Sequence, residues 1–506
     1  VLNAEVLQKN NINIYTNARI NYRESQASAF YRPPASDISN PNGFLPIIDT
    51  KILDYAFVAG LKGELPHSVT WDLSNSYGVN DFHYYVKDSM NYSLGTASPK
   101  SFDNGSLNFA QNTTNLDFRK STKGMKIAGG LEFRYENYQI TAGESNSYTG
   151  TGSQGFAGFT QENAVDEDRY SYAIYIDSIY DFTSDFSLEV LARYEEYSDF
   201  GESTNAKLAL SYKLTPEVFL RTSGSTGFRA PSLAQSNYSQ TSSFVNTNGS
   251  LVRQGTFTVN HEVAEALGAK ELKSERSKNF SVGSVYQASK NLSLMLDYFY
   301  IQVNDRILLT NDLSGETQAQ KDILAKNGVA QARFFTNAAR TDTQGIDLKL
   351  DYQYLIDGDE KLDFNIWFNY TENKMQHSSS MAESEVTTVR IQDGQPKDSL
   401  RFLTNYEVDK FNMALNISRF GEYSQMIDSV AYNFDALWIT DLDISYEITK
   451  KAKVAIGATN LFDITPNKWD GLSGDFYGSN GIKPYSRYSP VGYSGAYYYL
   501  RASMEF

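Results

Sequence analysis

Apolar and polar residues alternate along much of the chain, which is the period of β-strands with one apolar face. Between residues 362 and 371, one face carries Leu362, Phe364, Ile366, Phe368 and Tyr370. The other face of that segment carries Asp363, Asn365, Trp367, Asn369 and Thr371. The same alternation recurs in residues 186–195, 346–354 and 438–448. The pattern predicts an all-β protein built from antiparallel strands.

The length of these alternating runs separates two kinds of β-protein. The runs extend over about 10 to 16 residues, whereas strands of globular proteins most often have roughly 5–6. A tilted strand needs about 9–11 residues to cross a bilayer. In a barrel, lipid covers the apolar face and water or a plug covers the polar face. The runs therefore favour a transmembrane antiparallel β-barrel over the alternative, a tyrosine-rich soluble β-protein.

The predicted strands are separated by short and long connections in alternation. About eighteen strands follow a stub at residues 1–7. They lie near residues 11–24, 54–65, 68–87, 112–121, 124–138, 169–182, 185–198, 204–214, 217–228, 273–287, 290–306, 332–355, 361–374, 398–407, 410–420, 436–449, 451–460 and 490–506. The long connections lie near 25–53, 88–111, 139–168, 229–272, 307–331, 375–397 and 461–489. This regularity is typical of an outer-membrane barrel, which has tight periplasmic turns and long extracellular loops.

Composition agrees with a barrel and excludes several other classes. The 506 residues carry a net charge of −15, which disfavours nucleic acid as a partner. The 36 Tyr and 30 Phe are sufficient for aromatic girdles at both membrane interfaces. Cysteine is absent, so no disulfide is predicted, and the four His residues are far apart in sequence, so nothing indicates a metal site, with calcium binding by acidic loops as the alternative. No cofactor is predicted. The chain contains no run of 18 apolar residues that would predict a transmembrane helix.

No motif predicts an enzyme. The glycine-rich segment 150–155 lies in a long loop and lacks the strand–turn–helix context of a phosphate-binding loop. Two other loop segments, His261–Leu267 and Gln318–Asn327, have helix-forming composition and are followed by Gly268 and Gly328. We expect these helices to pack the loops over the barrel mouth, and a direct role in substrate capture is the alternative.

One strand exit has a distinctive motif. The segment Ser225–Leu233 reads STGFRAPSL, with Gly227 and Pro231 on either side of the exit. Proline cannot donate to a β-ladder, so it fits the end of a strand. Alternation places Arg229 on the inward face with Arg221 and Ser223. The segment resembles the GFRAP signature of TonB-dependent receptors. We expect Arg229 to form a structural ion pair inside the barrel, with substrate contact as the alternative.

Further segments resemble the same family in the same order. Residues 193–201 read RYEEYSDFG and are similar to its RYEDYSDFG motif, which places Arg193 and Glu195 inward, toward a plug. Residues 343–347 (TQGID) and 460–463 (NLFD) are similar to two later elements of the family. The last strand ends at Phe506, and a terminal Phe is typical of outer-membrane barrels.

The resemblance implies a larger architecture than the chain displays. Receptors of this family have a barrel of about 22 strands that encloses a plug. Neither the plug nor a TonB-contacting segment is visible in this sequence. We therefore expect residues 1–506 to form the transmembrane barrel domain, with the plug and about three strands upstream of Val1.

The resemblance also implies a function and a location. It implies TonB-dependent import of a scarce nutrient across the outer membrane of a Gram-negative bacterium. A ferric siderophore, cobalamin and an oligosaccharide all remain open as substrates. TonB, outer-membrane lipid and lipopolysaccharide are the other expected partners. A passive porin or a surface adhesin is the alternative.

Candidate substrate-binding residues come from the two richest loops. The last long loop contributes Trp469, Phe476, Tyr477, Tyr485 and Tyr488, and the longest loop contributes Phe244 and Arg253. Aromatic rings can stack on a sugar or a siderophore ring, and arginine can pair with a carboxylate. The alternative for each residue is loop packing or membership of the aromatic girdle.

Overall fold

The structure is a computed structural model of the chain. It describes residues 1–7, 12–29, 31–32, 34, 42–245, 251–356, 360–377, 379–382, 384–427, 430–468 and 485–505.

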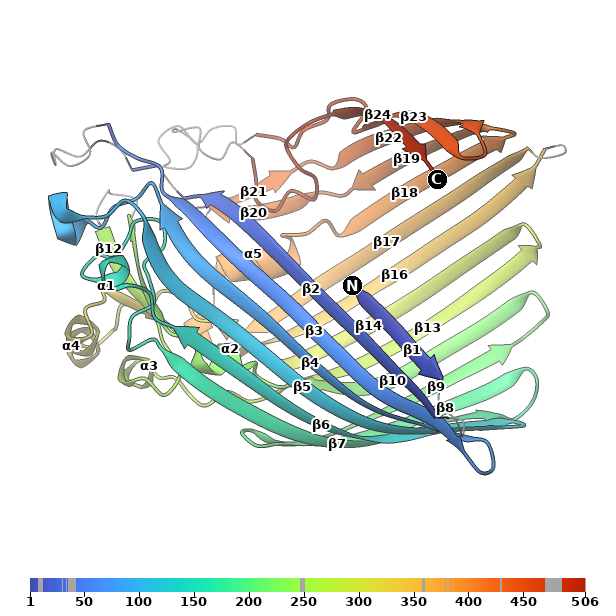
Figure 1. The fold of residues 1–506 in the computed structure, drawn as a ribbon, viewed down its shortest axis with the longest axis horizontal. Coiled ribbons are helices and arrows are strands. Elements are labelled where there is room, and N and C mark those ends of the chain that lie inside the picture. The colour runs from blue at the N-terminus through green and yellow to red at the C-terminus, as the bar shows by residue number, and fades with distance from the viewer. Residues whose placement is uncertain are drawn as a thin grey trace.

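A single antiparallel sheet of nineteen strands dominates the described part of the chain (Figure 1). Its strands are β1 (Leu2–Leu7), β2 (Ile12–Ser28), β3 (Ile47–Leu65), β4 (Val69–Lys87), β5 (Phe102–Thr122), β6 (Met125–Thr141), β7 (Val165–Asp181), β8 (Phe186–Tyr197), β9 (Gly201–Lys213), β10 (Val218–Arg229), β13 (Glu275–Ser289), β14 (Leu292–Leu309), β16 (Phe335–Leu355), β17 (Lys361–His377), β18 (Asp398–Val408), β19 (Phe411–Phe420), β22 (Leu437–Thr449), β23 (Ala452–Thr459) and β24 (Tyr497–Met504). The predicted eighteen strands and N-terminal stub are thereby confirmed.

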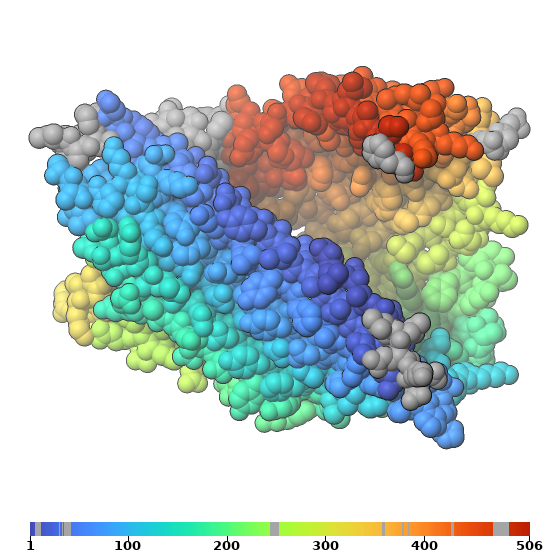
Figure 2. All heavy atoms as spheres, in the orientation of Figure 1, coloured from blue at the N-terminus to red at the C-terminus, as the bar shows by residue number. Residues whose placement is uncertain are grey.

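The sheet curves into a barrel wall in which each strand pairs with the next along the chain. The two edge strands are β1, which pairs with β2, and β24, which pairs with β23. Between described residues no ladder joins β1 to β24. Figure 2 shows the corresponding interruption of the wall between the blue N-terminal strands and the orange and red C-terminal strands.

The outward face is the apolar face that the sequence predicted. Ile346 is 41% exposed, Trp438 is 52% exposed and Leu500 is 82% exposed, as lipid contact requires. Exposed aromatic rings form two bands on this face. The band nearer the tight turns includes Tyr180, Phe182, Tyr212, Tyr286 and Tyr354, and the band nearer the loops includes Tyr22, Tyr135, Tyr172, Phe280, Tyr370 and Trp438. No helix in the described ranges combines the length and apolarity needed to cross a membrane.

Several strands extend further than predicted at the end that carries the long loops. The strand predicted to begin at residue 54 begins at Ile47, and the one predicted to begin at residue 112 begins at Phe102. Beyond the membrane both faces of a strand meet polar surroundings, so the alternation that marks a strand in the sequence fades while the ladder continues. The last strand is shorter than predicted, because only Tyr497–Met504 of residues 490–506 form it.

The long loops contain secondary structure of their own. The loop helices are η1 (Tyr92–Ala97), α1 (Ser145–Tyr148), α2 (Leu233–Asn237), α3 (Glu262–Ala266), α4 (Gln318–Lys326), η2 (Ser380–Ala382) and α5 (Glu385–Gln392). The loop strands are β11 (Gln240–Val245), β12 (Leu251–Thr256), β15 (Gln331–Arg333), β20 (Tyr423–Ile427) and β21 (Val430–Phe434). The two predicted helices are present as α3 and α4. Gly268 and Gly328 follow them with φ of 95° and 67°, a conformation that favours glycine.

On the inner wall, a long side chain repeatedly reaches over a glycine to an aspartate two strands away. Tyr175, Gly130 and Asp117 are paired in one row, and the Tyr175 hydroxyl donates to Asp117 over 2.6 Å. Tyr499, Gly457 and Asp443 form a second row, also with a 2.6 Å hydrogen bond.

A third row contains Arg221, Gly283 and Asp297. The Arg221 guanidinium donates to both carboxylate oxygens of Asp297, over 3.0 and 2.6 Å. A Cβ on Gly283 would overlap Asp297 Oδ1 and lie 3.1 Å from Arg221 Nε. These glycines therefore let polar side chains lie flat on the wall and join three strands.

We expect the Gly283→Ala substitution to weaken the barrel, because the Arg221–Asp297 pair must move to admit the methyl group. Loss of a charged hydrogen-bonded pair should lower the free energy of unfolding by about 1–3 kcal/mol. Urea unfolding of the refolded protein, followed by its heat-modifiable mobility in gels, measures the change.

Gly224→Ala on the adjacent strand is the matched control. The atom nearest to a Cβ added at Gly224 is Asn279 O, at 4.0 Å, so this change should be close to neutral. Equal destabilisation by the two substitutions would contradict the role assigned to Gly283.

Candidate functional site

Arg193 and Glu195 belong to a charged cluster on the inner wall. Arg193 donates to Glu195, and its Nη2 lies 3.2 Å from Glu132 Oε1. Arg134 also pairs with Glu132, at 2.6 Å, and the Tyr197 hydroxyl donates to Glu195 over 2.9 Å. Glu195 is only 8% exposed. The cluster fixes charged groups on the lumen side of β6 and β8, and contact with a plug stays a prediction.

Arg229 forms a bidentate ion pair across the wall with Glu275. Arg229 Nε and Nη2 lie 2.8 and 2.6 Å from the two Glu275 carboxylate oxygens. Glu275 also accepts the backbone N–H of Ile307 over 2.8 Å, so it joins β10, β13 and β14. Gly227 lies one inward position before Arg229, where a Cβ would approach Ser277 Oγ to 2.8 Å. The arrangement fixes the exit of β10 and is an ion pair of the kind expected for Arg229, and substrate contact stays the alternative.

The sequence interpretation missed Arg169, which holds the same exit from the other side. Arg169 is 4% exposed, and its Nη1 donates to the carbonyl of Pro231 over 2.8 Å. Its guanidinium also lies 2.9 Å from Glu136 and 3.4 Å from Asp199. Burial raises the pKa of Asp199, in the turn between β8 and β9, although the nearby Arg169 opposes the rise. The sequence signal that could have identified Arg169 is its position on the inward face at the loop end of β7.

The loops between β2 and β3, β4 and β5, and β6 and β7 are tied to one another by buried polar groups. Asn91 is fully buried, and its side-chain amide donates to the carbonyls of Asn146 and Thr149 over 2.9 and 2.8 Å. Arg32 Nε donates to Gln154 over 3.0 Å. An apolar cluster beneath these contacts is formed by Tyr138, Ile140, Phe159 and Leu233. These loops are therefore prepacked into one unit.

A second unit, here called the α3–α4 unit, combines the β10–β13 and β14–β16 loops. Strands β12 and β15 pair in parallel, and Ala330 donates to the carbonyl of Arg253 over 2.9 Å. The core of the unit consists of Phe257, Val263, Ala264, Leu267, Leu324, Val329, Ala332 and Phe334. Lys326 pairs with Glu262 at 2.9 Å on its surface. The helices thus pack on each other within the loops, and a direct role in substrate capture stays the alternative.

The side chain of His261 caps the N-terminus of α3. His261 Nδ1 accepts the backbone N–H of Val263 over 3.2 Å, and the ring stacks on Phe257 with centroids 4.2 Å apart. Burial lowers the pKa of His261, with an opposing effect of Glu262 and Glu162. Only a ring without a proton on Nδ1 can accept this bond, so the cap requires neutral histidine.

The predicted substrate-binding residues lie in separate places. Tyr485 stacks on Tyr493 with centroids 5.3 Å apart, and the Tyr488 ring lies 5.5 Å from the Arg487 guanidinium. Arg253 lies in β12 of the α3–α4 unit, with its guanidinium next to Gly328. No hydrogen bond, ion pair or ring contact between described residues joins Arg253 to Tyr485 or Tyr488. Substrate binding by these residues stays a prediction.

The remaining aromatic candidates cannot be placed in the same way. Phe244 lies in β11, where it pairs with Val252, but its side chain is outside the described part. Trp469, Phe476 and Tyr477 lie outside the described residues.

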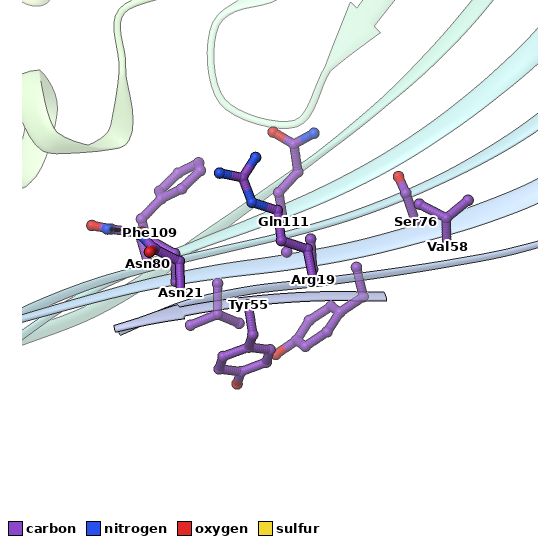
Figure 3. Close-up of a pocket in the computed structure, with 13 residues that line it drawn as sticks. Arg19, Asn21, Tyr55, Val58, Ser76, Asn80, Phe109 and Gln111 are labelled. Carbon is purple, nitrogen blue, oxygen red and sulfur yellow. Dashed lines mark hydrogen bonds between the residues drawn. The ribbon is translucent and has the colours of Figure 1, made fainter. Parts of the chain in front are cut away.

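The inner wall of β2–β5 contains a hollow that the sequence interpretation missed (Figure 3). Its volume is about 540 Å³, and small residues such as Ala56, Ser76 and Gly78 form part of its lining. Arg19 and Gln111 point to the lumen side, whereas Tyr55 points to the opposite side of the wall. Within the described chain, Arg19 has no ion pair. The hollow therefore offers a free guanidinium to an anionic or amide-bearing group.

Acidic and amide groups flank Arg19 at this hollow. Asp54 accepts hydrogen bonds from Asn80 over 2.6 Å and from Asn21 over 3.2 Å, and it pairs with Arg23 at 3.3 Å. Nowhere in the described ranges do three or more His, Asp or Glu residues form a group that could hold a metal ion. The geometry is suited to non-covalent binding.

The nineteen-strand wall, its lipid-facing apolar surface and its charged lumen define an outer-membrane β-barrel. The model of the family described as "TonB dependent receptor-like, beta-barrel" matches residues 3–461. The chain therefore belongs to the TonB-dependent receptor family, whose members are transporters and not enzymes, and it is a protein of the Gram-negative outer membrane. A comparison with curated proteins finds no match.

Solved structures share the fold at low sequence identity. A variant of the ferric enterobactin receptor PfeA from Pseudomonas aeruginosa is 14% identical with a TM-score of 0.64, over 99% of this chain and 68% of that one. The siderophore receptor PirA from Acinetobacter baumannii is 12% identical with a TM-score of 0.62, over 99% and 76%. The FrpB iron transporter from Neisseria meningitidis is 11% identical with a TM-score of 0.61, over 91% and 67%.

We expect acidification to loosen the α3–α4 unit through His261. The folded loop favours the neutral ring, so this contribution to stability is fully present above the ordinary pKa of about 6.5. It is lost as the pH falls through that value toward the lowered pKa of the folded state. Hydrogen exchange of residues 262–267, corrected for the intrinsic rate, should show less protection at pH 5 than at pH 7.5.

His261→Asn supplies the control, because asparagine keeps an acceptor at the helix start and does not titrate. Its protection should change little over the same range. An equal acid-induced loss in this variant would show that His261 is not the group responsible.

Proposed function

We propose that the chain forms the barrel of an importer that uses TonB to carry a scarce, bulky nutrient across the outer membrane. The match of residues 3–461 to the receptor barrel family carries this proposal. Family membership implies interaction with TonB and binding of a substrate. A plug, on which TonB would act, and the assignment of all 506 residues to the barrel domain remain part of the proposal.

The described residues support different roles for the loops, which would bind substrate, and for the lumen, through which it would pass. The prepacked loop units would form a rigid rim for binding on the outer side, since their buried cores leave few groups to order on binding. In the lumen, paired charges such as Arg193 and Glu132 would stabilise the wall. Arg19, which has no ion pair in the described part of the chain, would bind an anionic group of the substrate during passage. No covalent step is required.

A ferric siderophore is the substrate class that we propose first. The fold is shared with receptors whose names specify ferric enterobactin, a siderophore or iron. An anionic ferric complex would also suit the unpaired Arg19. Cobalamin and an oligosaccharide remain the competing substrates, for which the loop aromatics Tyr485 and Tyr488 could supply stacking surfaces.

Uptake in a strain that lacks the gene for this protein, complemented or not, tests the proposal. Iron-loaded siderophores, labelled cobalamin and labelled oligosaccharides are offered in turn to cells with and without functional TonB. We expect one class, and first the siderophores, to accumulate only when both the protein and TonB are present. Equal accumulation without TonB would favour the alternative of a passive porin, and no accumulation of any class would favour an adhesin.

Two arginine substitutions separate surface binding from passage. We expect Arg19→Gln to slow energised uptake of an anionic substrate by about tenfold, the equivalent of one charged hydrogen bond, with surface binding unchanged. Arg253→Gln should instead weaken binding to de-energised cells if the loop residue captures substrate, as the sequence predicts. Unchanged uptake by the Arg19 variant would remove the hollow from the transport path.

A further inference from the structure

Two side-chain amides on β4 and β5 face lipid. Asn75 continues the alternation of Leu73 and Tyr77, which are 40% and 39% exposed on the outward face. Asn112 follows Gln111, which points to the lumen side of the wall in Figure 3, so Asn112 also points outward. Lipid contact favours apolar side chains, so the two amides contrast with the surface around them.

Asn75 lies near the middle of the apolar band. Asp81, the first charged outward residue of β4 toward the loops, is six residues from Asn75. A strand rises about 3.3 Å per residue and is tilted by about 45°, so this separation amounts to about 14 Å along the membrane normal. Val69, where β4 begins after the tight turn, is six residues away in the other direction. Water and lipid head groups are therefore distant from Asn75.

The two amides bond to each other and to Thr114, but two donors remain. Asn75 Nδ2 donates to Asn112 Oδ1 over 2.9 Å and to Thr114 Oγ1 over 2.8 Å. Asn112 Nδ2 donates one N–H to Asn75 Oδ1 over 3.1 Å. Among the described residues, the second N–H of Asn112 and the hydroxyl hydrogen of Thr114 have no acceptor. Asn75, Asn112 and Thr114 are here called the amide patch.

Three threonines elsewhere on the lipid face differ from the amide patch. The hydroxyls of Thr16, Thr222 and Thr404 donate to backbone carbonyls of the neighbouring strand, over 2.9, 2.9 and 3.1 Å. A hydroxyl has one donor and is satisfied in this way, whereas an amide has two. A free donor in hydrocarbon costs free energy unless a partner accepts its hydrogen. The amide patch is therefore suited to contact with a polar group of another protein in the membrane.

The outward face beside the amide patch is indented. A hollow of about 620 Å³ lies on its tight-turn side, where Phe118, Gly129 and Ile176 are partners in one row across β5, β6 and β7. In the row of the patch, Phe133 is the partner of Thr114 on β6 and is 36% exposed. The face thus combines a polar centre, an exposed ring and space for side chains of a partner.

We propose that the amide patch is the centre of a homodimer interface, at which a second copy of this chain covers it. Copies that insert with their loops on the same side are related by a twofold axis parallel to the membrane normal. Such an axis brings residues of equal depth together, so Asn112 lies opposite the same residue of the second copy. An amide both donates and accepts, so the two amides can bond reciprocally. An unrelated partner would need its own polar group at this depth.

Photo-crosslinking in the outer membrane tests the proposal. The full-length protein carries a benzophenone amino acid in place of Phe133, and two differently tagged copies are expressed together. We expect irradiation to yield a product of twice the mass that contains both tags. The same probe in place of Ile346, which is 41% exposed on the distant strand β16, should not yield this product.

The double variant Asn75→Leu/Asn112→Leu separates a role in dimerisation from a role within the wall. It removes the amides and leaves an apolar surface, so the yield of the doubly tagged product should fall about tenfold. Heat-modifiable mobility shows that the variant barrel is folded. Thr222→Val is the matched control, because it removes a lipid-facing hydroxyl that is already bonded to a carbonyl, and it should leave the yield unchanged.

Three results would overturn the proposal. The first is an equal yield of the doubly tagged product from the Asn75→Leu/Asn112→Leu protein and the wild type. The second is cross-linking at position 133 to lipid alone, which would show that acyl chains cover the patch. The third is a product with a different protein, which would show that the patch does not bind a second copy.

Discussion

The requirement that every backbone N–H and C=O find a partner within lipid determines this structure. Water is absent from the bilayer core, and an unsatisfied group there costs several kcal/mol. Long antiparallel ladders meet this requirement. In long strands such as β4, with nineteen residues, the ladder continues beyond the membrane toward the loops. The ladders fix which residues face lipid and which face the lumen. All the sites described here depend on that division.

The lumen is polar, and its polar groups are bound to one another in ways that stiffen the wall. Arg221, Tyr175 and Tyr499 each reach across a glycine to an aspartate on the third strand of a row. Arg229 and Arg169 hold the exit of β10 from two sides. Against this background of paired groups, Arg19 has no ion pair in the described part of the chain and is available to a ligand. It belongs to the proposed import path.

Alternation in the sequence was enough to predict the strands, their faces and the inward direction of Arg193 and Arg229, because these depend only on residues close in the chain. Alternation does not predict contacts that depend on pairing between segments distant in the sequence. The parallel pairing of β12 with β15 joins residues 254–256 to residues 331–333, and no local sequence pattern predicts this pairing. For Arg169, alternation indicates the inward direction but not the contacts, because its partners come from three other segments. Alternation places Arg19 on the inward face, like many other residues. The space in front of it depends on the small side chains of β3 and β4, which become its neighbours only in the folded sheet.

The central claim, a membrane barrel with its apolar face on lipid, can be tested directly because the chain contains no cysteine. Single cysteines at successive positions from Ile346 to Asp351 in β16 would carry spin labels in the outer membrane. Labels at positions 346, 348 and 350 should be accessible to oxygen dissolved in lipid, and labels at positions 347, 349 and 351 to a water-soluble nickel chelate. Accessibility that does not alternate, or that alternates with the opposite phase, would contradict this account of the fold.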